Sequence, residues 1–117
     1  MSDLLDRDAL GQLKDFIQGK FTEVVEVYLR SSAGYVQGVQ DGFAAQDAKA
    51  VADNAHPLKS SSGNLGLVAM QALAEEIEDL AHAVLAGEQH SAALAPLVEK
   101  TGSVYEASAA LLKAELA

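Results

Sequence analysis

Apolar residues recur at steps of three and four along almost the whole chain, and this spacing constrains the fold more than any other feature of the sequence. Such steps place apolar side chains on one face of an α-helix. Runs of β-branched and aromatic residues, which are typical of strands, are missing. The pattern therefore predicts an all-α protein.

The spacing predicts five helices, over about residues 4–17, 21–45, 47–65, 70–87 and 94–112. Connections of about two to eight residues favour antiparallel neighbours. We therefore expect an antiparallel four-helix up-down bundle with a short N-terminal helix capping one end. Residues 1–117 would form one domain, because 117 residues is an ordinary size for a single domain.

Three glycines fall at steps of four inside the expected second helix, at Gly34, Gly38 and Gly42. Each one costs up to about 1 kcal/mol relative to alanine in a helix interior. One interpretation is a weak or bent helix. The other is that a neighbouring backbone approaches closely along the glycine row. The sequence leaves both open.

Composition excludes several kinds of function. The chain has no cysteine, so disulfides and thiolate chemistry are ruled out. The apolar stretches are shorter than the roughly 20 residues of a membrane span, and the N-terminus does not resemble a signal peptide. A net charge of −9 with eight scattered basic residues argues against binding nucleic acid. We expect a cytoplasmic protein that binds neither nucleic acid nor membrane.

His56 is the main candidate for a chemical role, because it lies on the wrong face of the expected third helix. At about 100° per residue, it points roughly 120° or more away from the apolar face. Ser60 and Gly63 share its outward stripe, and Lys59 flanks it one turn away. Small neighbours leave room for another surface, and an imidazole nitrogen is a competent nucleophile near neutral pH. Lys59 places a cation where a phosphoryl group on the ring would sit.

The segment from Ala55 to Gly66, AHPLKSSSGNLG, resembles the signature of histidine-containing phosphotransfer domains. That signature reads alanine-histidine-any-leucine-lysine, then small residues, then leucine-glycine. The similarity continues in the next helix and in the order of the helices, and the matching positions there are Met70, Leu73, Glu76, Ile77 and Glu78.

The resemblance implies a four-helix bundle that exposes a phospho-accepting histidine. His56 would take the phosphoryl group on Nε2, Lys59 would help balance its charge, and Gly63 would leave space for the partner. Ser60 stands where the family commonly has glycine, and its hydroxyl could hydrogen-bond the imidazole or the phosphate.

The implied partners are receiver domains of a hybrid sensor histidine kinase and of a response regulator. The chain would act as a stoichiometric phosphocarrier without kinase activity, and it would need no cofactor or metal of its own. No glycine-rich nucleotide-binding segment is present, and the length leaves no room for an ATP domain.

Pro57 departs from the expected pattern. Inside a helix, proline removes a hydrogen bond, here the one to the Asp53 carbonyl, and costs about 3 kcal/mol or more. Either the helix kinks just before His56, which is the favoured outcome, or a new helical segment begins at Pro57.

Two other functions compete with phosphotransfer. The first is an adaptor that binds signalling partners without phosphorylation, through the surface formed by the small residues beside His56. The second is a metal-binding bundle built on two Asp-x-x-His pairs, Asp53 with His56 and Asp79 with His82. Ligands of such bundles point inward, whereas both pairs are expected to face outward.

The remaining polar residues are interpreted as surface features. His82 and His90 are expected to be ordinary surface residues. The acidic cluster of the fourth helix is expected to be a solvated face, and it comprises Glu75, Glu76, Glu78 and Asp79. A monomer is expected because a four-helix bundle can close its own core, and the start at Met1 favours a stand-alone protein. The sequence does not identify the kinase, the regulator or the stimulus.

Overall fold

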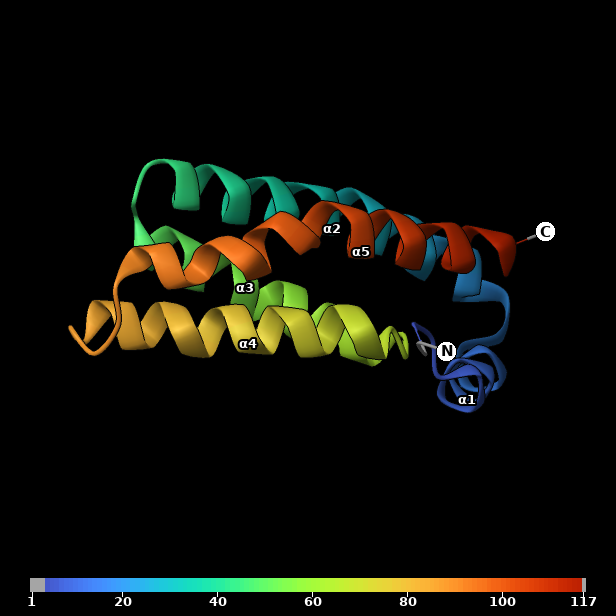
Figure 1. Cartoon of the computed structure of the whole chain (residues 1–117). Helices are drawn as coiled ribbons and strands as arrows, with labels where there is room; N and C mark the ends of the chain where they lie inside the picture. Colours follow the sequence, from blue (N-terminus) through green and yellow to red (C-terminus); the bar gives the residue numbers. More distant parts are fainter. Residues whose placement is uncertain (1–3, 117) are drawn as a thin grey trace.

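Four long helices lie side by side in an up-and-down bundle (Figure 1). The computed structural model describes residues 4–116. The bundle helices are α2 (Phe21–Ala44), α3 (Ala48–Asn64), α4 (Val68–Leu85) and α5 (Ala95–Ala114). Each contacts the next in the chain, and α5 returns to contact α2. The predicted antiparallel four-helix bundle is confirmed.

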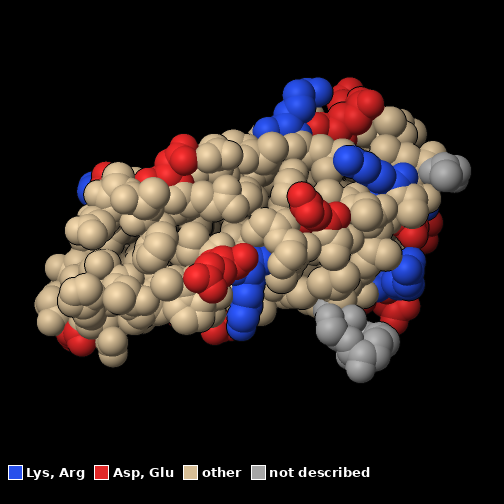
Figure 2. Space-filling model, turned by 45° about the horizontal axis from the view of Figure 1, so that its top comes forward, with Lys and Arg blue, Asp and Glu red and all other residues tan. Residues whose placement is uncertain are grey.

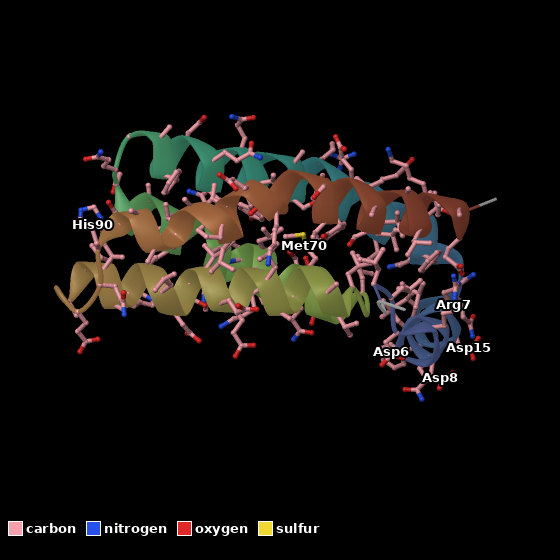
Figure 3. The ribbon with its side chains drawn as sticks, in the orientation of Figure 1. Asp6, Arg7, Asp8, Asp15, Met70 and His90 are labelled. Atoms are coloured by element: carbon pink, nitrogen blue, oxygen red, sulfur yellow. The ribbon has the colours of Figure 1, made fainter. Side chains whose placement is uncertain are left out.

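The short helix α1 (Arg7–Ile17) lies at one end of the bundle, as expected (Figure 1). The Asp6 side chain caps it by accepting a hydrogen bond from the backbone N–H of Ala9, at 3.1 Å. Figure 3 shows Arg7 at this end, and its guanidinium lies 3.0 Å from Glu115, just beyond the end of α5. Two 3₁₀ turns, η1 (Gln18–Lys20) and η2 (Ser91–Leu94), lead into α2 and α5.

The turn between α3 and α4 is tied to the start of α1 through Gly66. Gly66 has a φ of 74°, a left-handed conformation that glycine adopts without strain. Its carbonyl accepts a hydrogen bond of 2.7 Å from the backbone N–H of Asp6. A Cβ atom at this position would lie 2.9 Å from the Asp6 carbonyl oxygen. Position 66 therefore requires glycine for two separate reasons.

The bundle core consists mainly of leucine, valine and alanine, with Met70 pointing inward from α4 (Figure 3). In α3 the buried positions are Val51, Ala55 and Leu58. This face fixes the rotation of α3 about its own axis, so His56, between Ala55 and Leu58, is directed outward. The fully buried core side chains include Val25, Val39, Val51, Ala55, Leu58, Met70, Ala74, Ile77, Ala81 and Leu112.

Two pairs of hydroxyl groups join α2 to its neighbours, one pair to α3 and the other to α5. The hydroxyls of Tyr28 and Ser62 are 2.8 Å apart, and those of Ser32 and Tyr105 are also 2.8 Å apart. Burial raises the pKa of the Tyr28 hydroxyl, so the group stays neutral across the physiological pH range. Because buried hydroxyls are costly to leave unpaired, the contact between Tyr28 and Ser62 restricts rotation and sliding of α3 against α2.

Helix α3 continues through Pro57 without a break. The alternative in which a new helical segment begins at Pro57 is therefore wrong, and the kink remains a prediction. Proline at position 57 cannot donate a backbone hydrogen bond to the Asp53 carbonyl. One turn further on, the hydroxyl of Ser61 donates to the carbonyl of Pro57 at 2.7 Å and adds a local contact to the helix. Burial of Ala55 and Leu58 on either side of His56 and Pro57 stabilises the helical path despite the proline.

The charged side chains of both signs are interspersed on the face shown in Figure 2, rather than gathered by sign. Within residues 4–116, no helix combines the length and the apolar character that crossing a membrane requires.

The glycine row of α2 serves different purposes along its length. A Cβ atom at Gly42 would lie 3.0 Å from the backbone nitrogen of Val51, and one at Gly38 would overlap the Asn54 side chain. A Cβ atom at Gly34 would have no such neighbour within 4 Å. Close approach of α3 thus accounts for Gly38 and Gly42, whereas Gly34 only weakens the helix.

This difference predicts opposite effects for two alanine substitutions. Gly42→Ala crowds the Val51 backbone and should lower the free energy of unfolding by about 1–3 kcal/mol. Gly34→Ala removes backbone freedom at an open site and should raise it by about 0.5–1 kcal/mol. Urea unfolding followed by circular dichroism measures both changes. Equal stabilisation by the two substitutions would contradict the close approach at Gly42.

Candidate functional site

His56 lies on the outer side of α3, and its side chain is 65% exposed. The direction follows from the buried face of the helix, since Ala55 and Leu58 both point into the core. The structure therefore leaves the ring accessible to another molecule, as the helical geometry predicts.

Glu78 of α4 binds the inner edge of the His56 ring. Its Oε2 atom lies 2.8 Å from His56 Nδ1, and only 11% of the Glu78 side chain is exposed. An ionised carboxylate can only accept a hydrogen bond, so Nδ1 must carry the proton and donate. In a neutral ring this arrangement leaves the lone pair on Nε2, at the opposite side of the ring from Glu78. The contact therefore leaves Nε2, and not Nδ1, as the ring nitrogen that is free to bond to another group.

Lys59 binds the other oxygen of the same carboxylate. Its Nζ atom lies 2.8 Å from Glu78 Oε1, one helical turn beyond His56. Burial by itself would raise the pKa of Glu78, but the contacts with Lys59 and His56 outweigh it, so the pKa is lowered. The contact with Glu78 raises the pKa of Lys59. At neutral pH the site holds an ionised carboxylate beside a charged ammonium.

The solvated face that the sequence predicts for the acidic cluster is wrong at Glu78. Glu75, Glu76 and Asp79 are not buried, whereas Glu78 is buried against α3. Signals for this burial were present in the sequence. Glu78 lies four residues after Ala74 and three before Ala81, so it shares the small-residue stripe that α4 presents to the core.

The structure brings Ser60 and Gly63 to the same side of α3 as His56, but neither contacts the ring. The Ser60 hydroxyl lies 3.4 Å from the carbonyl oxygens of His56 and Pro57, so it turns back to its own helix. A Cβ atom at Gly63 would lie 2.8 Å from the Gln71 side chain of α4. The space beside Gly63 is thus partly occupied by this neighbour.

An apolar groove runs between α2 and α3 on the side of His56 away from α4. Its volume is about 580 Å³, and the described residues that line it include no charged side chain. Pro57 and Ser60, on either side of the His56 turn, form one wall, and Val27 of α2 is 46% exposed in the opposite wall. The full lining is Leu13, Val24, Val27, Tyr28, Ser31, Tyr35, Pro57, Ser60, Ser61, Asn64 and Leu65. Sequence reasoning did not find this groove.

The two Asp-x-x-His pairs do not converge on a common point. Asp53 forms an ion pair with Lys49 at 2.7 Å, and Asp79 lies on the outer side of α4. Within the described part of the chain, no three His, Cys, Asp or Glu side chains are arranged to hold a metal ion.

The other two histidines lie at the surface, as expected. His82 Nε2 lies 3.7 Å from Glu78 Oε2, and its side chain is 61% exposed. Figure 3 shows His90 at the end of the bundle opposite Arg7, and its Nδ1 accepts a hydrogen bond from the Ala92 backbone. Of these two histidines, His82 is therefore the one close to the His56 site.

Comparison with solved structures supports the fold. The crystal structure of histidine-containing phosphotransfer protein B (HptB) from Pseudomonas aeruginosa PAO1 superposes with a TM-score of 0.77. The match covers 98% of this chain and 96% of that one, at 23% sequence identity. The likeness shows a shared fold.

Comparison of sequences points to the same group of proteins. The aerobic respiration control sensor protein ArcB of Escherichia coli K12 is 30% identical over 76 residues, and its Shigella flexneri counterpart matches equally well. The alignment covers 64% of this chain and 10% of each relative, so the chain matches about a tenth of their length. The family model described as Hpt domain matches residues 23–117, which include nearly all of the four bundle helices. This chain belongs to the Hpt domain family.

Proposed function

We propose that this chain is a phosphorelay intermediate that accepts a phosphoryl group on His56 and passes it on. The donor would be the aspartate of one receiver domain, in a hybrid sensor kinase, and the acceptor the aspartate of another, in a response regulator. Membership of the Hpt domain family indicates a phosphotransfer role in two-component signalling. The observation that carries the finer proposal is the 2.8 Å contact between His56 Nδ1 and Glu78, which frees Nε2.

The transfer needs no proton to enter or leave the site. The Nε2 lone pair attacks phosphorus, the P–O bond to the aspartate breaks, and the aspartate leaves as a carboxylate. The Nδ1 proton stays in place, so the phosphorylated ring carries a positive charge beside the ionised Glu78. Glu78 stabilises that charge, and the reverse steps return the phosphoryl group to a second aspartate.

Three further residues would shape the surroundings of the phosphoryl group. Lys59, one turn from His56, would balance part of its negative charge. Ser60 has a weakly held hydroxyl that can turn towards phosphate oxygens, since its present contacts are 3.4 Å long. Gly63 has no side chain, so it would leave space for the partner beside the Gln71 side chain.

The receiver would rest on the apolar groove beside His56. Any domain that brings an aspartyl phosphate to Nε2 must cover the turn of α3 formed by Pro57 and Ser60, and both residues line the groove. An uncharged surface next to the reacting atom offers burial without leaving charges unpaired. The groove thus lies directly beside the proposed acceptor histidine, and one receiver domain could contact both.

The protein would be a stoichiometric carrier without kinase activity. We expect it to act in the cytoplasm as a monomer, with residues 1–117 forming one domain. An adaptor that does not depend on phosphorylation is the alternative. It would use the groove in the same way but would not need His56 and Lys59 to share a carboxylate.

Replacing the proposed acceptor distinguishes the two functions. His56→Gln removes the nucleophile and should abolish labelling by a radiolabelled phospho-receiver with magnesium. The wild type should carry an acid-labile, alkali-stable label. His90→Gln, a change of the same kind at the far end of the bundle, is the control and should be labelled normally. Equal labelling of His56→Gln and the wild type would rule out His56 as acceptor.

Glu78 should affect the rate of transfer because it selects the reactive tautomer. Glu78→Leu removes the charge-assisted hydrogen bond, typically worth about 1.5–3 kcal/mol, and should slow transfer at least about tenfold. Glu78→Gln has an amide oxygen that can accept a hydrogen bond from Nδ1, so it should slow transfer less than Glu78→Leu does. Rapid-quench measurement of single-turnover transfer gives both rates. Wild-type rates in Glu78→Leu would show that the contact has no part in the reaction.

Val27 tests the groove as the docking surface. Val27→Lys places a charge in the apolar wall and should slow transfer at low receiver concentration by about tenfold, the loss expected for one of the few interface residues that contribute more than about 1 kcal/mol to binding. Leu85→Lys is the matched control, because Leu85 is similarly exposed, at 53% against 46% for Val27, and does not line the groove. Equal effects of the two substitutions would place the receiver elsewhere.

A further inference from the structure

Phe16 of α1 is the most exposed large apolar side chain among residues 4–116, and the proposed reaction does not use it. Its exposed fraction is 86%, against 2% for Leu10 on the same helix. Single apolar residues at a protein surface are common and need no function. Phe16 differs from them because it lies beside the groove next to His56.

Helical geometry places Phe16 next to the α1 residue that lines the groove. That residue is Leu13. At about 100° per residue, Phe16 lies about 60° to one side of Leu13 and Lys14 about 100° to the other. The Lys14 ammonium lies 3.7 Å from Glu115, beyond the end of α5, and 4.9 Å from the centre of the Phe21 ring. Phe16 is therefore on the flank of α1 away from α5, where it extends the apolar surface of the groove.

The attachment of α1 to the bundle holds Phe16 in a fixed place. Leu10 is buried beneath the helix, and the backbone N–H of Asp6 donates to the carbonyl of Gly66 at 2.7 Å. An aromatic side chain has only two torsions, so on a fixed helix it loses little entropy when a partner covers it. Phe16 is thus suited to anchor a partner.

The size of a protein interface carries the receiver as far as α1. A typical interface buries about 800 Å² on each partner, which corresponds to a roughly circular patch of about 16 Å radius. Pro57 and Leu65 both line the groove, and the eight residues of α3 between them span only about 12 Å. A receiver centred near His56 therefore reaches the α1 end of the groove.

Charge favours the same direction. Glu75 and Asp79 of α4 are exposed and lie close enough to Lys59 to act on its charge. The receiver approaches with a phosphorylated aspartate, which is an anion, so this acidic flank repels its reacting edge. The groove on the other side of His56 has no charged residue in its described lining. The receiver is thus expected to cover the side that leads to Phe16.

We propose that Phe16 contacts the receiver domain that covers His56 and serves as an aromatic anchor outside the reactive site. The matching surface of the receiver would be an apolar depression beside its phosphorylated aspartate. Phe16 would increase the affinity of the receiver without touching the reacting atoms. This inference rests on the proposed function, since it takes a receiver as the occupant of the groove.

Transfer measured over a range of receiver concentrations tests the contact. Phe16→Ser should raise the concentration for half-maximal transfer by about tenfold, the loss expected for one anchor of an interface. The maximal rate should stay within about twofold of the wild type, because the lost contact is the same before and during transfer. Phe16→Leu retains an apolar side chain and should lose less affinity than Phe16→Ser. Leu85→Ser, at the other end of the bundle and also exposed, should behave as the wild type.

Phosphoramidate, a donor too small to reach α1 from His56, separates docking from chemistry. It should label Phe16→Ser and the wild type at the same rate. An unchanged half-maximal receiver concentration in Phe16→Ser would overturn the contact and leave the role of His56 intact. Slower labelling of this variant by phosphoramidate would place the effect in the reactive site and also overturn it.

Two further outcomes decide between the possible occupants. Sedimentation that shows a wild-type dimer dissociated by Phe16→Ser would assign Phe16 to a second copy of the chain and overturn the inference. Failure of both donors to label His56 in the wild type would overturn the proposed function and this inference together.

Discussion

The buried carboxylate of Glu78 is the constraint on which the rest of the site depends. A carboxylate that is largely removed from water is unstable unless positive groups and donors surround it. Here they come from α3, where His56 and Lys59 each contact one oxygen. Burial of one acidic group in α4 thus holds two α3 side chains in position. The same contact fixes the proton on the histidine ring.

Much of the fold could be predicted from the sequence because helical periodicity is a local property. The spacing of apolar residues predicted the helices of the bundle and the outward direction of His56. Asp47 caps the start of α3, a common position for aspartate, and its side chain accepts a hydrogen bond from the Ala50 backbone N–H at 3.0 Å. Pro57 shows the limit of local rules. Its intrinsic effect is to break a helix, yet the burial of Ala55 and Leu58 on either side stabilises a continuous α3.

The features that escaped prediction depend on how two helices are placed against each other. Glu78 stands among acidic neighbours in the sequence, although its position relative to Ala74 and Ala81 puts it on the buried stripe. The groove beside His56 exists only through the relative rotation of α2 and α3. The same rotation decides which glycines of α2 meet α3, so the sequence could not separate Gly34 from Gly42.

Helix α1 lies outside residues 23–117, the part of the chain that matches the family model, yet it contributes Leu13 to the groove beside His56. The hydrogen bond between Asp6 and Gly66 attaches it to the turn that follows α3. The proposed acceptor histidine and this part of the groove therefore belong to separate segments of the chain, whose sequences can change independently. Under the proposed function, changes in α1 would alter the surface offered to the partner during evolution while His56, Lys59 and Glu78 stay unchanged.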